Sequence, residues 1–322
     1  MEKYFNILLL YLSWLASVVT KKAFLWGFPP SIGVEISSHC NLSCPECATG
    51  SGNLNREKGF MEPGTFRKIV DELKPFLFNI NLYFQGEPML NPGFFDFAAI
   101  AGGIGMTLST NGHFITENSA AKLINSGIRK IIIPLDGMDQ DTYGRYRLGG
   151  DIERVKEGIR ILSEAKKNAH SGLTLEIQFL VNKYNYHQID KARRFALSSG
   201  FRFRLKSMQI ISGDYEKWLP PGNEFKRFRR YVKRNGKYVS GLTPENRCLR
   251  LWMNPVITWD GKVLPCCFDK SGEFSFGKLG EESFTRIWKG EKSMSFRNRF
   301  LSHRSGIKIC MNCTTGLKNV SV

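Results

Sequence analysis

Three cysteines near the amino terminus, Cys40, Cys44 and Cys47, have a spacing that suits iron–sulfur chemistry. They follow a predicted strand, Ile32–Ser38, and so lie on one short loop. Three thiolates cannot complete a tetrahedral zinc site without a distant fourth ligand, such as His39. They can instead hold three irons of a [4Fe–4S] cluster and leave the fourth iron open. An open iron lets a small molecule coordinate and take up an electron.

The five other cysteines form a second group in the last quarter of the chain. They are Cys248, Cys266, Cys267, Cys310 and Cys313. Disulfide frameworks spread their cysteines along a chain, whereas tight groups suggest metal ligation in a reducing compartment. We therefore expect a cytoplasmic protein. The spacing in this second group is compatible with an iron–sulfur cluster or with a four-cysteine zinc site.

Short β-rich runs alternate with helical segments from residue 32 onward and predict an α/β fold. Six βα repeats predict a partial (β/α)6 barrel of the TIM type, followed by a small C-terminal α+β module, with the site at the carboxyl ends of the strands. A flat, doubly wound sheet is the alternative. The predicted strands are Ile32–Ser38, Asn79–Gln85, Ile104–Ser109, Ile128–Pro134, Leu173–Val181 and Phe201–Ile210. The predicted helices are Pro63–Lys74, Pro92–Ala101, Thr116–Ser126, Asp151–Ala169 and Tyr186–Ser199.

Short polar motifs follow three consecutive predicted strands. They are QGEP at 85–88, STNG at 109–112 and LDG at 135–137. Each motif alone could be a turn, but their recurrence at successive strand ends predicts a single ligand-binding edge. Gln178 and Asn182, on and after the fifth strand, are weaker candidates for the same edge.

The spacing Cys40-x3-Cys44-x2-Cys47, after the first strand of a βα series, resembles the signature of radical S-adenosylmethionine (SAM) enzymes. In that family the open iron binds the amino and carboxylate groups of SAM. Reductive cleavage gives methionine and a 5′-deoxyadenosyl radical, which abstracts a substrate hydrogen. The resemblance implies SAM-contacting roles for Gly86, Glu87, Ser109, Asn111, Asp136 and Gln178. The chain departs from the family pattern at two positions. Glu46 stands where the family often has an aromatic residue, and Pro134 stands where it often has a serine.

The second cysteine group resembles the SPASM module, or its shorter twitch form, which carries auxiliary iron–sulfur clusters. Cys248 is followed by twelve residues, Gly261 in a predicted hairpin turn, four residues and Cys266, which matches the opening element of that module. The full form needs at least seven cysteines, so five imply one auxiliary [4Fe–4S] cluster. The implied ligands are Cys248, Cys266, Cys310 and Cys313, with Cys267 spare or substituting for Cys266. Such a cluster could accept or relay an electron.

The first residues form an uncharged, mostly apolar segment, Tyr4 to Thr20, which is followed by two lysines. At about 100° per residue, the polar residues fall on one face of a helix, joined by a single leucine. That face comprises Lys3, Asn6, Leu10, Ser13, Ser17 and Thr20. The pattern favours a helix lying in the membrane interface, with the lysines meeting anionic headgroups. A core helix, a signal sequence and a spanning helix are the alternatives.

The composition, with 42% hydrophobic and 23% charged residues, is that of a globular protein and excludes a disordered chain. The net charge of +17 predicts anionic partners such as phosphates or lipid headgroups. A basic stretch, Phe225–Lys237, suits either a solvated helix face with inward aromatics or an anion-binding patch. Nucleic acid is not expected as a partner, because no recognised nucleic-acid module is present. Arg145 and Arg147 are candidate substrate contacts, and Tyr143 and Cys267 candidate proton donors, but no catalytic residue is assigned.

The chain is thus expected to contain an N-terminal helix (1–30), a radical SAM barrel (31–211), a basic bridge (212–247) and an auxiliary-cluster module (248–322). The resemblance implies SAM cleavage followed by oxidation or epimerisation of a sugar, cyclitol or lipid-linked substrate. A reduced flavodoxin or ferredoxin is the expected electron donor. A peptide-modifying maturase and a membrane-tethered iron–sulfur electron carrier are the alternatives. The expected location is the cytoplasm, or the cytoplasmic face of the inner membrane.

Overall fold

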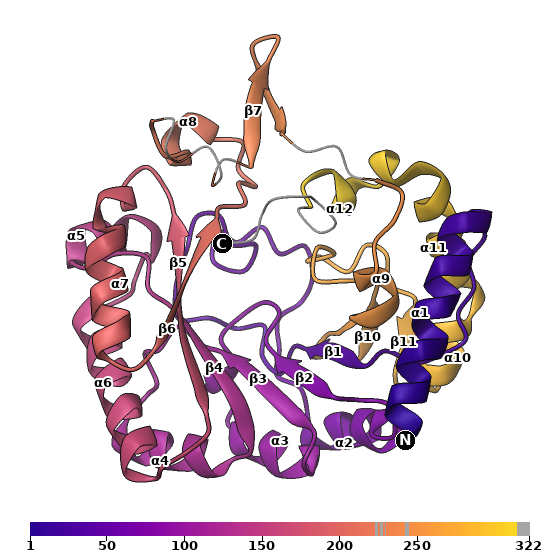
Figure 1. Ribbon diagram of the computed structural model, residues 1–322, viewed down its shortest axis with the longest axis horizontal. Coiled ribbons are helices and arrows are strands. Elements are labelled where there is room, and N and C mark those ends of the chain that lie inside the picture. The colour runs from indigo at the N-terminus through magenta and orange to yellow at the C-terminus, as the bar shows by residue number, and fades with distance from the viewer. Residues whose placement is uncertain (223–224, 226–227, 229, 242–244, 314–322) are drawn as a thin grey trace.

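Six parallel strands form a curved sheet at the centre of the protein (Figure 1). The computed structural model describes all residues except 223–224, 226–227, 229, 242–244 and 314–322. The strands are β1 (Ser31–Val34), β2 (Asn79–Leu82), β3 (Gly105–Ser109), β4 (Ile128–Pro134), β5 (Thr174–Val181) and β6 (Arg202–Ser207). Each strand pairs in parallel with the next one along the chain, which confirms the predicted partial barrel and excludes a doubly wound order.

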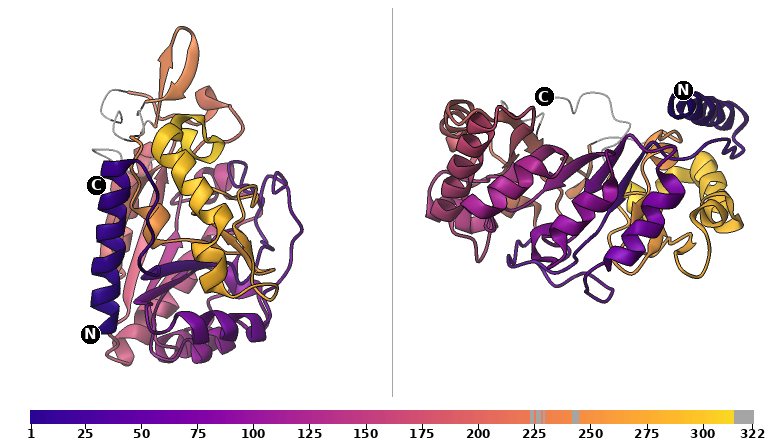
Figure 2. Two further views of the ribbon diagram at one scale, coloured as in Figure 1. Left: turned by 90° about the vertical axis from the view of Figure 1, so that its right-hand side faces the viewer. Right: turned by 90° about the horizontal axis from the view of Figure 1, so that it is seen from below.

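Helices cover the outer face of this sheet (Figures 1 and 2). They are α2 (Pro63–Leu73), α3 (Phe94–Ala101), α4 (Glu117–Asn125), α6 (Ile152–Asn168) and α7 (Ile189–Ser198). Outward-facing strand residues such as Ile133 and Ile177 share one apolar core with Leu162 of α6. The predicted helices are confirmed, although the last of them begins with a short 3-10 turn, Tyr186–Gln188. A further helix, α5 (Gln140–Tyr146), was not predicted.

The inner face of the sheet is mainly polar. Successive side chains of a strand point to opposite faces, and most of the polar ones fall on the inner side. The parallel register places Ser109, Ile132 and Glu176 in one row. It places Gln178 beside Arg204 in the next row. Since the alternate residues point outward into the apolar core, hydrogen-bonding and charged groups line the inside of the barrel.

The C-terminal strands extend the same sheet instead of forming a separate one. β9 (Val256–Ile257) pairs in parallel with β1, and β10 (Lys262–Leu264) and β11 (Gly277–Lys278) follow in antiparallel order. The predicted hairpin turn between β9 and β10 is confirmed, with Gly261 at a φ of 87° that favours glycine. The helices described in this C-terminal part are α9 (Arg250–Met253), α10 (Phe284–Lys289), α11 (Glu291–His303) and α12 (Lys308–Met311). Both cysteine groups are consequently attached to a single sheet.

A short hairpin projects from the segment between β6 and α9 (Figure 1). Its strands are β7 (Tyr231–Arg234) and β8 (Lys237–Ser240), and α8 (Tyr215–Trp218) precedes it. The helix considered for the basic stretch is therefore wrong for residues 231–237, while 226–227 and 229 lie outside the described residues. Phe228 and Tyr231 are buried, whereas Phe225 and Tyr238 are half-buried, so the predicted inward orientation is confirmed for two of the four aromatic residues.

The N-terminal helix α1 (Glu2–Thr20) packs with its polar side toward the protein. Its buried residues are Asn6, Leu10, Ser13 and Ser17. The Asn6 amide donates to the backbone oxygen of Phe28 and accepts from its N–H, both at 2.8 Å. The Ser17 hydroxyl accepts from the N–H of Phe24 at 2.8 Å. The opposite face exposes the apolar residues Tyr4, Phe5, Leu8, Tyr11, Leu12, Leu15 and Val19.

The segment that connects α1 to β1, residues 21–30, is fastened by the C-terminal helices. The indole N–H of Trp252 donates to the backbone oxygen of Phe24 at 2.9 Å, and that of Trp288 to Gly27 at 3.1 Å. As Figure 2 shows, α1 lies as a straight rod along one side of the molecule. Within the described part of the chain, α1 alone has the length and apolar composition of a membrane span.

The orientation of α1 predicts unequal effects of substitutions on its two faces. Replacing Asn6 with leucine leaves the Phe28 backbone groups without partners, and we expect the free energy of unfolding to fall by about 1–3 kcal/mol. Replacing the exposed Leu12 with serine should change it by less than about 0.5 kcal/mol. Urea unfolding followed by tryptophan fluorescence measures both, and equal effects would contradict this orientation.

Candidate active site

Cys40, Cys44 and Cys47 lie on the loop after β1, where they are buried or half-buried. Burial is the main cause that raises the pKa of Cys40 to about 11, with smaller contributions from Glu87 and the other two thiols. Burial likewise raises the pKa of Cys44, although Arg147 partly offsets it. The ionisation of Cys40 and Cys44 is opposed by burial and by neighbouring thiols, which suits ligation to iron, because iron replaces the protons with cations. This donor set could hold the predicted cluster.

A buried ion pair lies directly beneath the cysteine loop. The guanidinium of Arg147 is 2.6 Å from the carboxylate of Asp136, and one of its N–H groups is 3.7 Å from the Cys44 sulfur. The second Asp136 oxygen accepts from the N–H of Leu180 at 2.7 Å. Burial opposes the charge on Arg147, but Asp136 and Cys44 outweigh this effect and raise its pKa. Arg147, a candidate substrate contact from the sequence, is thus engaged beneath the loop.

The QGEP loop lies against the chain that leads into Cys40. Gly86 has a φ of 75°, and a β-carbon there would lie 2.4 Å from the backbone oxygen of Ser37. The next N–H, that of Glu87, donates to the backbone oxygen of His39 at 2.7 Å. Because only glycine fits this approach without displacing the backbone, Gly86 sets the distance between the loops after β1 and β2.

The Glu87 carboxylate joins the loops after β2 and β3. It accepts from the Thr110 hydroxyl and the Asn111 N–H, both at 2.7 Å. Burial raises the pKa of Glu87 to about 6, against these hydrogen bonds. The Asn111 side chain donates in turn to Asn41, beside Cys40, at 2.7 Å. Gly86, Glu87 and Asn111 therefore meet at the cysteine loop, as the sequence predicted.

The other predicted SAM contacts have different surroundings. Asp136 lies under the loop, while Ser109 and Gln178 lie on the inner face of the sheet. The Gln178 amide donates to Glu176 at 2.7 Å, and Glu176 forms a 2.6 Å ion pair with Lys130. The weaker candidates also form local contacts: Asn182 bonds within its own turn, and Tyr143 is fully buried.

Glu46 has a structural role that the sequence did not reveal. Its buried carboxylate accepts from the N–H groups of Ile211 and Ser212 at 2.6 and 3.0 Å, and from the Ser212 hydroxyl at 2.5 Å. The chain after β6 is thereby held against the cysteine loop. The one sign of this role in the sequence was that an acidic residue replaces the aromatic residue common in the family.

Four of the C-terminal thiols form one group. Burial raises the pKa values of Cys248, Cys266 and Cys310. Each of these pKa values is raised further by the charge of at least one other thiol of the group. The fourth member is Cys313. Cys266 interacts with its neighbour Cys267 and also with Cys248 and Cys313, whereas the Cys267 sulfur accepts from the Arg250 guanidinium at 3.1 Å. This arrangement favours Cys266 over Cys267 as the ligand.

Both thiol groups supply the sulfur donors that an iron–sulfur cluster requires. A tetrahedral zinc site requires its ligands to converge on one ion, whereas each thiolate of a [4Fe–4S] cluster binds a separate iron. The donor chemistry therefore suits iron–sulfur clusters at both places.

A partial barrel with three thiols at the carboxyl end of β1, and a second thiol group on the same sheet, defines an iron–sulfur enzyme of the radical type. The chain belongs to the radical SAM superfamily, whose family model matches residues 34–196, just over half of its length. Residues 248–314 match the SPASM iron–sulfur cluster-binding domain. The protein accordingly uses a [4Fe–4S] cluster and SAM, together with auxiliary iron–sulfur binding in the C-terminal domain.

Relatives with different activities resemble most of the chain. A Pyrococcus furiosus protein that modifies the cofactor of tungsten-containing aldehyde ferredoxin oxidoreductase is 26% identical, covering 87% of this chain and 86% of that protein. The SAM-dependent 2-deoxy-scyllo-inosamine dehydrogenase of Niallia circulans is 25% identical, covering 90% and 93%. The crystal structure of Streptococcus suis SuiB bound to SAM superimposes with a TM-score of 0.68 at 16% identity, covering 93% of this chain and 75% of SuiB.

The buried ion pair predicts a strong dependence of the cysteine loop on Arg147. Replacing Arg147 with methionine leaves the Asp136 carboxylate buried without its partner, and we expect about 3–5 kcal/mol loss of stability and less iron after anaerobic reconstitution. The double variant Arg147→Met, Asp136→Asn should recover part of both. The exposed Arg145→Met is the matched control. Wild-type iron content and stability in Arg147→Met would contradict this role.

Proposed function

We propose that Cys40, Cys44 and Cys47 hold the SAM-binding cluster and that Cys248, Cys266, Cys310 and Cys313 hold one auxiliary cluster. We further propose that the enzyme oxidises or epimerises a sugar, cyclitol or lipid-linked substrate, with a reduced flavodoxin or ferredoxin as electron donor. When bound, SAM and the first cluster supply a 5′-deoxyadenosyl radical that removes a substrate hydrogen atom, and the auxiliary cluster supplies a nearby one-electron acceptor.

The observation that carries this proposal is the position of Lys270. Its ammonium group lies within electrostatic reach of both Cys47, in the first group, and Cys267, which adjoins Cys266 in the second. A substrate at the inner face near Lys270 would therefore be close to both cysteine groups. Oxidation requires such an arrangement, because the substrate radical must give up an electron after it loses a hydrogen atom.

The relatives support both a small-molecule and a peptide substrate. The Niallia circulans protein is a dehydrogenase of 2-deoxy-scyllo-inosamine, an amino-cyclitol, and this favours the first choice. SuiB, by contrast, has been crystallised with the precursor peptide SuiA, so a peptide-modifying enzyme is the second candidate. An electron carrier is disfavoured, because it has no need for the loops that Gly86, Glu87 and Asn111 bring to the cysteines.

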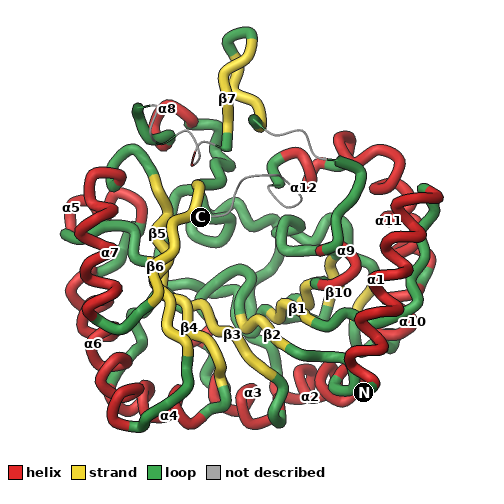
Figure 3. The backbone as a smooth tube through the Cα atoms, in the orientation of Figure 1, coloured by secondary structure: helices red, strands yellow, loops and turns green. Residues whose placement is uncertain are grey.

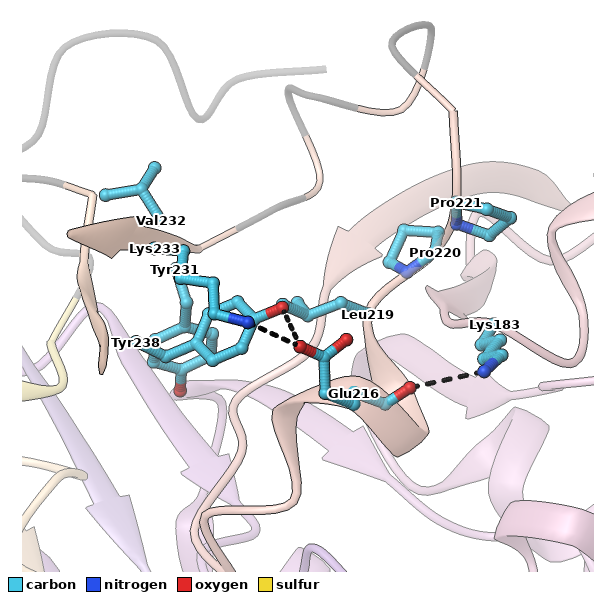
Figure 4. Close-up of a pocket in the computed structure, with 9 residues that line it drawn as sticks. All are labelled: Lys183, Glu216, Leu219, Pro220, Pro221, Tyr231, Val232, Lys233 and Tyr238. Carbon is cyan, nitrogen blue, oxygen red and sulfur yellow. Dashed lines mark hydrogen bonds and ion pairs between the residues drawn. The ribbon is translucent and has the colours of Figure 1, made fainter. Parts of the chain in front are cut away.

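A cavity at the rim of the barrel offers room for an extended substrate (Figure 4). Its volume is about 640 Å³. Its walls include Leu219, Pro220, Pro221, Tyr231 and Tyr238. The Tyr231 hydroxyl donates to Asn312, between Cys310 and Cys313, at 2.6 Å, and bonds Ile210 after β6. The cavity is thus attached to both the barrel and the C-terminal cysteines, and it suits the lipid or peptide portion of a substrate.

The proposed activity predicts release of 5′-deoxyadenosine by the reduced, anaerobically reconstituted enzyme. Stimulation by a membrane-lipid extract supports a lipid-linked substrate, and stimulation only by soluble metabolites supports a free sugar, cyclitol or peptide. Replacing Cys40, Cys44 and Cys47 together with alanine should abolish release while iron remains at the C-terminal thiols. Continued release by this variant would contradict the ligand assignment.

We also propose that the protein binds the cytoplasmic surface of a membrane through α1. The helix exposes Leu8, Leu12 and Val19 along one face, while its polar face is bonded to the protein. An apolar stripe on an amphipathic helix inserts into the interface between headgroups and acyl chains. Lys21 and Lys22 at its end are exposed and complement anionic headgroups. Because Asn6 and Ser17 hold the helix against the protein, it would lie in the membrane plane.

Vesicle sedimentation tests this attachment. The wild-type protein should sediment with vesicles of phosphatidylethanolamine and phosphatidylglycerol. The double variant Leu8→Glu, Leu12→Glu should bind at least about tenfold more weakly, because each buried leucine contributes about 1.5–3 kcal/mol. Leu197→Glu, at a more exposed position on α7, should bind as the wild type does. Absence of wild-type binding, or a dimer that the double variant dissociates, would contradict membrane attachment.

A further inference from the structure

Four basic side chains converge on the inner face of the barrel from both of its sides. They are Arg204 and Lys206 on β6, Arg250 on α9 and Lys270 after β10, here named the inner basic cluster. In Figures 1 and 3, β6 forms the left-hand part of the curved sheet and α9 lies on the right. The register places Arg204 beside Gln178, and Lys206 beside Leu180, on the inner face.

The thiol of Cys267 marks the place where these groups approach one another. The Arg250 guanidinium donates to its sulfur at 3.1 Å. Lys206 and Lys270 both lie within electrostatic reach of the same sulfur, and so does the half-exposed phenol of Tyr83 on the inner face after β2. The inner basic cluster therefore surrounds one small region between the two cysteine groups.

No member of the inner basic cluster forms a close ion pair within the described residues, although Glu176 acts on Lys206 and Glu46 acts on Lys270 from a longer distance. None of its four members has a carboxylate within ion-pairing distance, and the Lys270 ammonium donates to the Gln209 amide at 3.1 Å. The two nearest acids are engaged elsewhere. Glu176 forms an ion pair with Lys130, and Glu46 accepts from the chain after β6.

Arg204 and Lys206 are exposed and Arg250 and Lys270 are half-buried, and even partial desolvation of an unpaired cation is costly. Burial lowers the pKa of Lys206, and the neighbouring guanidinium of Arg204 lowers it further. Burial also lowers the pKa of Lys270, with Arg230 acting in the same direction. A bound anion would relieve both effects.

The cysteine groups already have cations of their own. Arg147 lies beside Cys44, and Arg304 bonds the Cys310 thiol and lowers its pKa against the effect of burial. In the inner basic cluster, Arg250 also acts on Cys248 and Cys266, and Lys270 acts on Cys47. Arg204 and Lys206 lie farther along β6 and add positive charge that is available to a molecule in the space between the cysteine groups.

We propose that the inner basic cluster is a binding subsite for a phosphate or pyrophosphate group of the substrate. The proposal rests on the function given above and names its substrate class. A phosphate monoester carries about −1.5 to −2 charges at neutral pH, which matches several cations better than a single carboxylate does. Arginine forks and lysine ammonium groups are the common partners of phosphate oxygens. Holding this unreactive group would fix the position of the hydrogen to be removed.

Binding of inorganic pyrophosphate tests the subsite. The probe is titrated calorimetrically into the cluster-loaded, full-length enzyme saturated with SAM, so that the SAM site is occupied. The wild-type protein should bind it, and acetate should bind more weakly. The double variant Lys206→Met, Lys270→Met should lose at least about tenfold in affinity, as expected for hydrogen bonds to a charged group.

A matched control removes the same charge from the rim cavity. Lys183 and Lys233 both bond Glu216, as Figure 4 shows, and the variant Lys183→Met, Lys233→Met should retain wild-type affinity for pyrophosphate. Undiminished binding by the Lys206→Met, Lys270→Met variant would overturn the proposal, as would no wild-type binding or tighter binding of acetate.

The same experiment separates the subsite from the proposed function. Pyrophosphate should suppress the stimulation of 5′-deoxyadenosine release by whichever extract is active. Suppression in the lipid arm identifies a lipid-linked phosphate, and suppression in the soluble arm a free sugar phosphate or nucleotide. Stimulation that pyrophosphate leaves intact would overturn the subsite alone. A wild-type enzyme that releases no 5′-deoxyadenosine but binds pyrophosphate through the inner basic cluster would overturn the radical chemistry alone.

Discussion

Buried carboxylates hold together the irregular loops at the carboxyl ends of the strands, and the arrangement of the site depends on them. Loop N–H groups lack the regular partners that a sheet supplies, so each needs another acceptor when it is buried. Glu87 accepts from the loop after β3, Asp136 from β5, and Glu46 from the chain after β6. All three carboxylates lie close to the loop that carries the first three cysteines. Glu46 is part of that loop, Asp136 lies beneath it and Glu87 lies beside it. The thiol positions are therefore fixed by hydrogen bonds that extend across the mouth of the barrel.

The sequence predicted the features that follow from local pattern. Strand periodicity located β1 to β6, and the recurrence of motifs at strand ends brought Glu87 and Asn111 to the cysteines. Features that depend on distant partners were missed. The pairing of β9 with β1 joins segments far apart in the chain, and the bond between Glu46 and Ser212 needs the folded barrel. The hairpin at 231–240 was missed because its basic, aromatic sequence also suits a helix.

The two faces of the sheet explain why one fold serves unrelated chemistries in this superfamily. The outer face is apolar and packs against helices, so its residues maintain the barrel. The inner face carries polar side chains that the core does not need, and these can differ without changing the fold. In this protein the inner residues include Arg204 and Lys206, two cations on β6 that do not belong to either cysteine group. The residues that select the substrate are therefore expected mainly at the inward-facing positions of the strands.

The pairing of β1 with both β2 and β9 has a consequence for the order of assembly. One neighbour of β1 is encoded shortly after it, whereas the other follows more than 200 residues later. Contacts of such long sequence separation form slowly. During synthesis, one edge of β1 stays open until β9 has emerged, and the adjacent cysteine loop lacks its final support until then. The cysteine loop therefore reaches its final arrangement only after more than 200 further residues have been made.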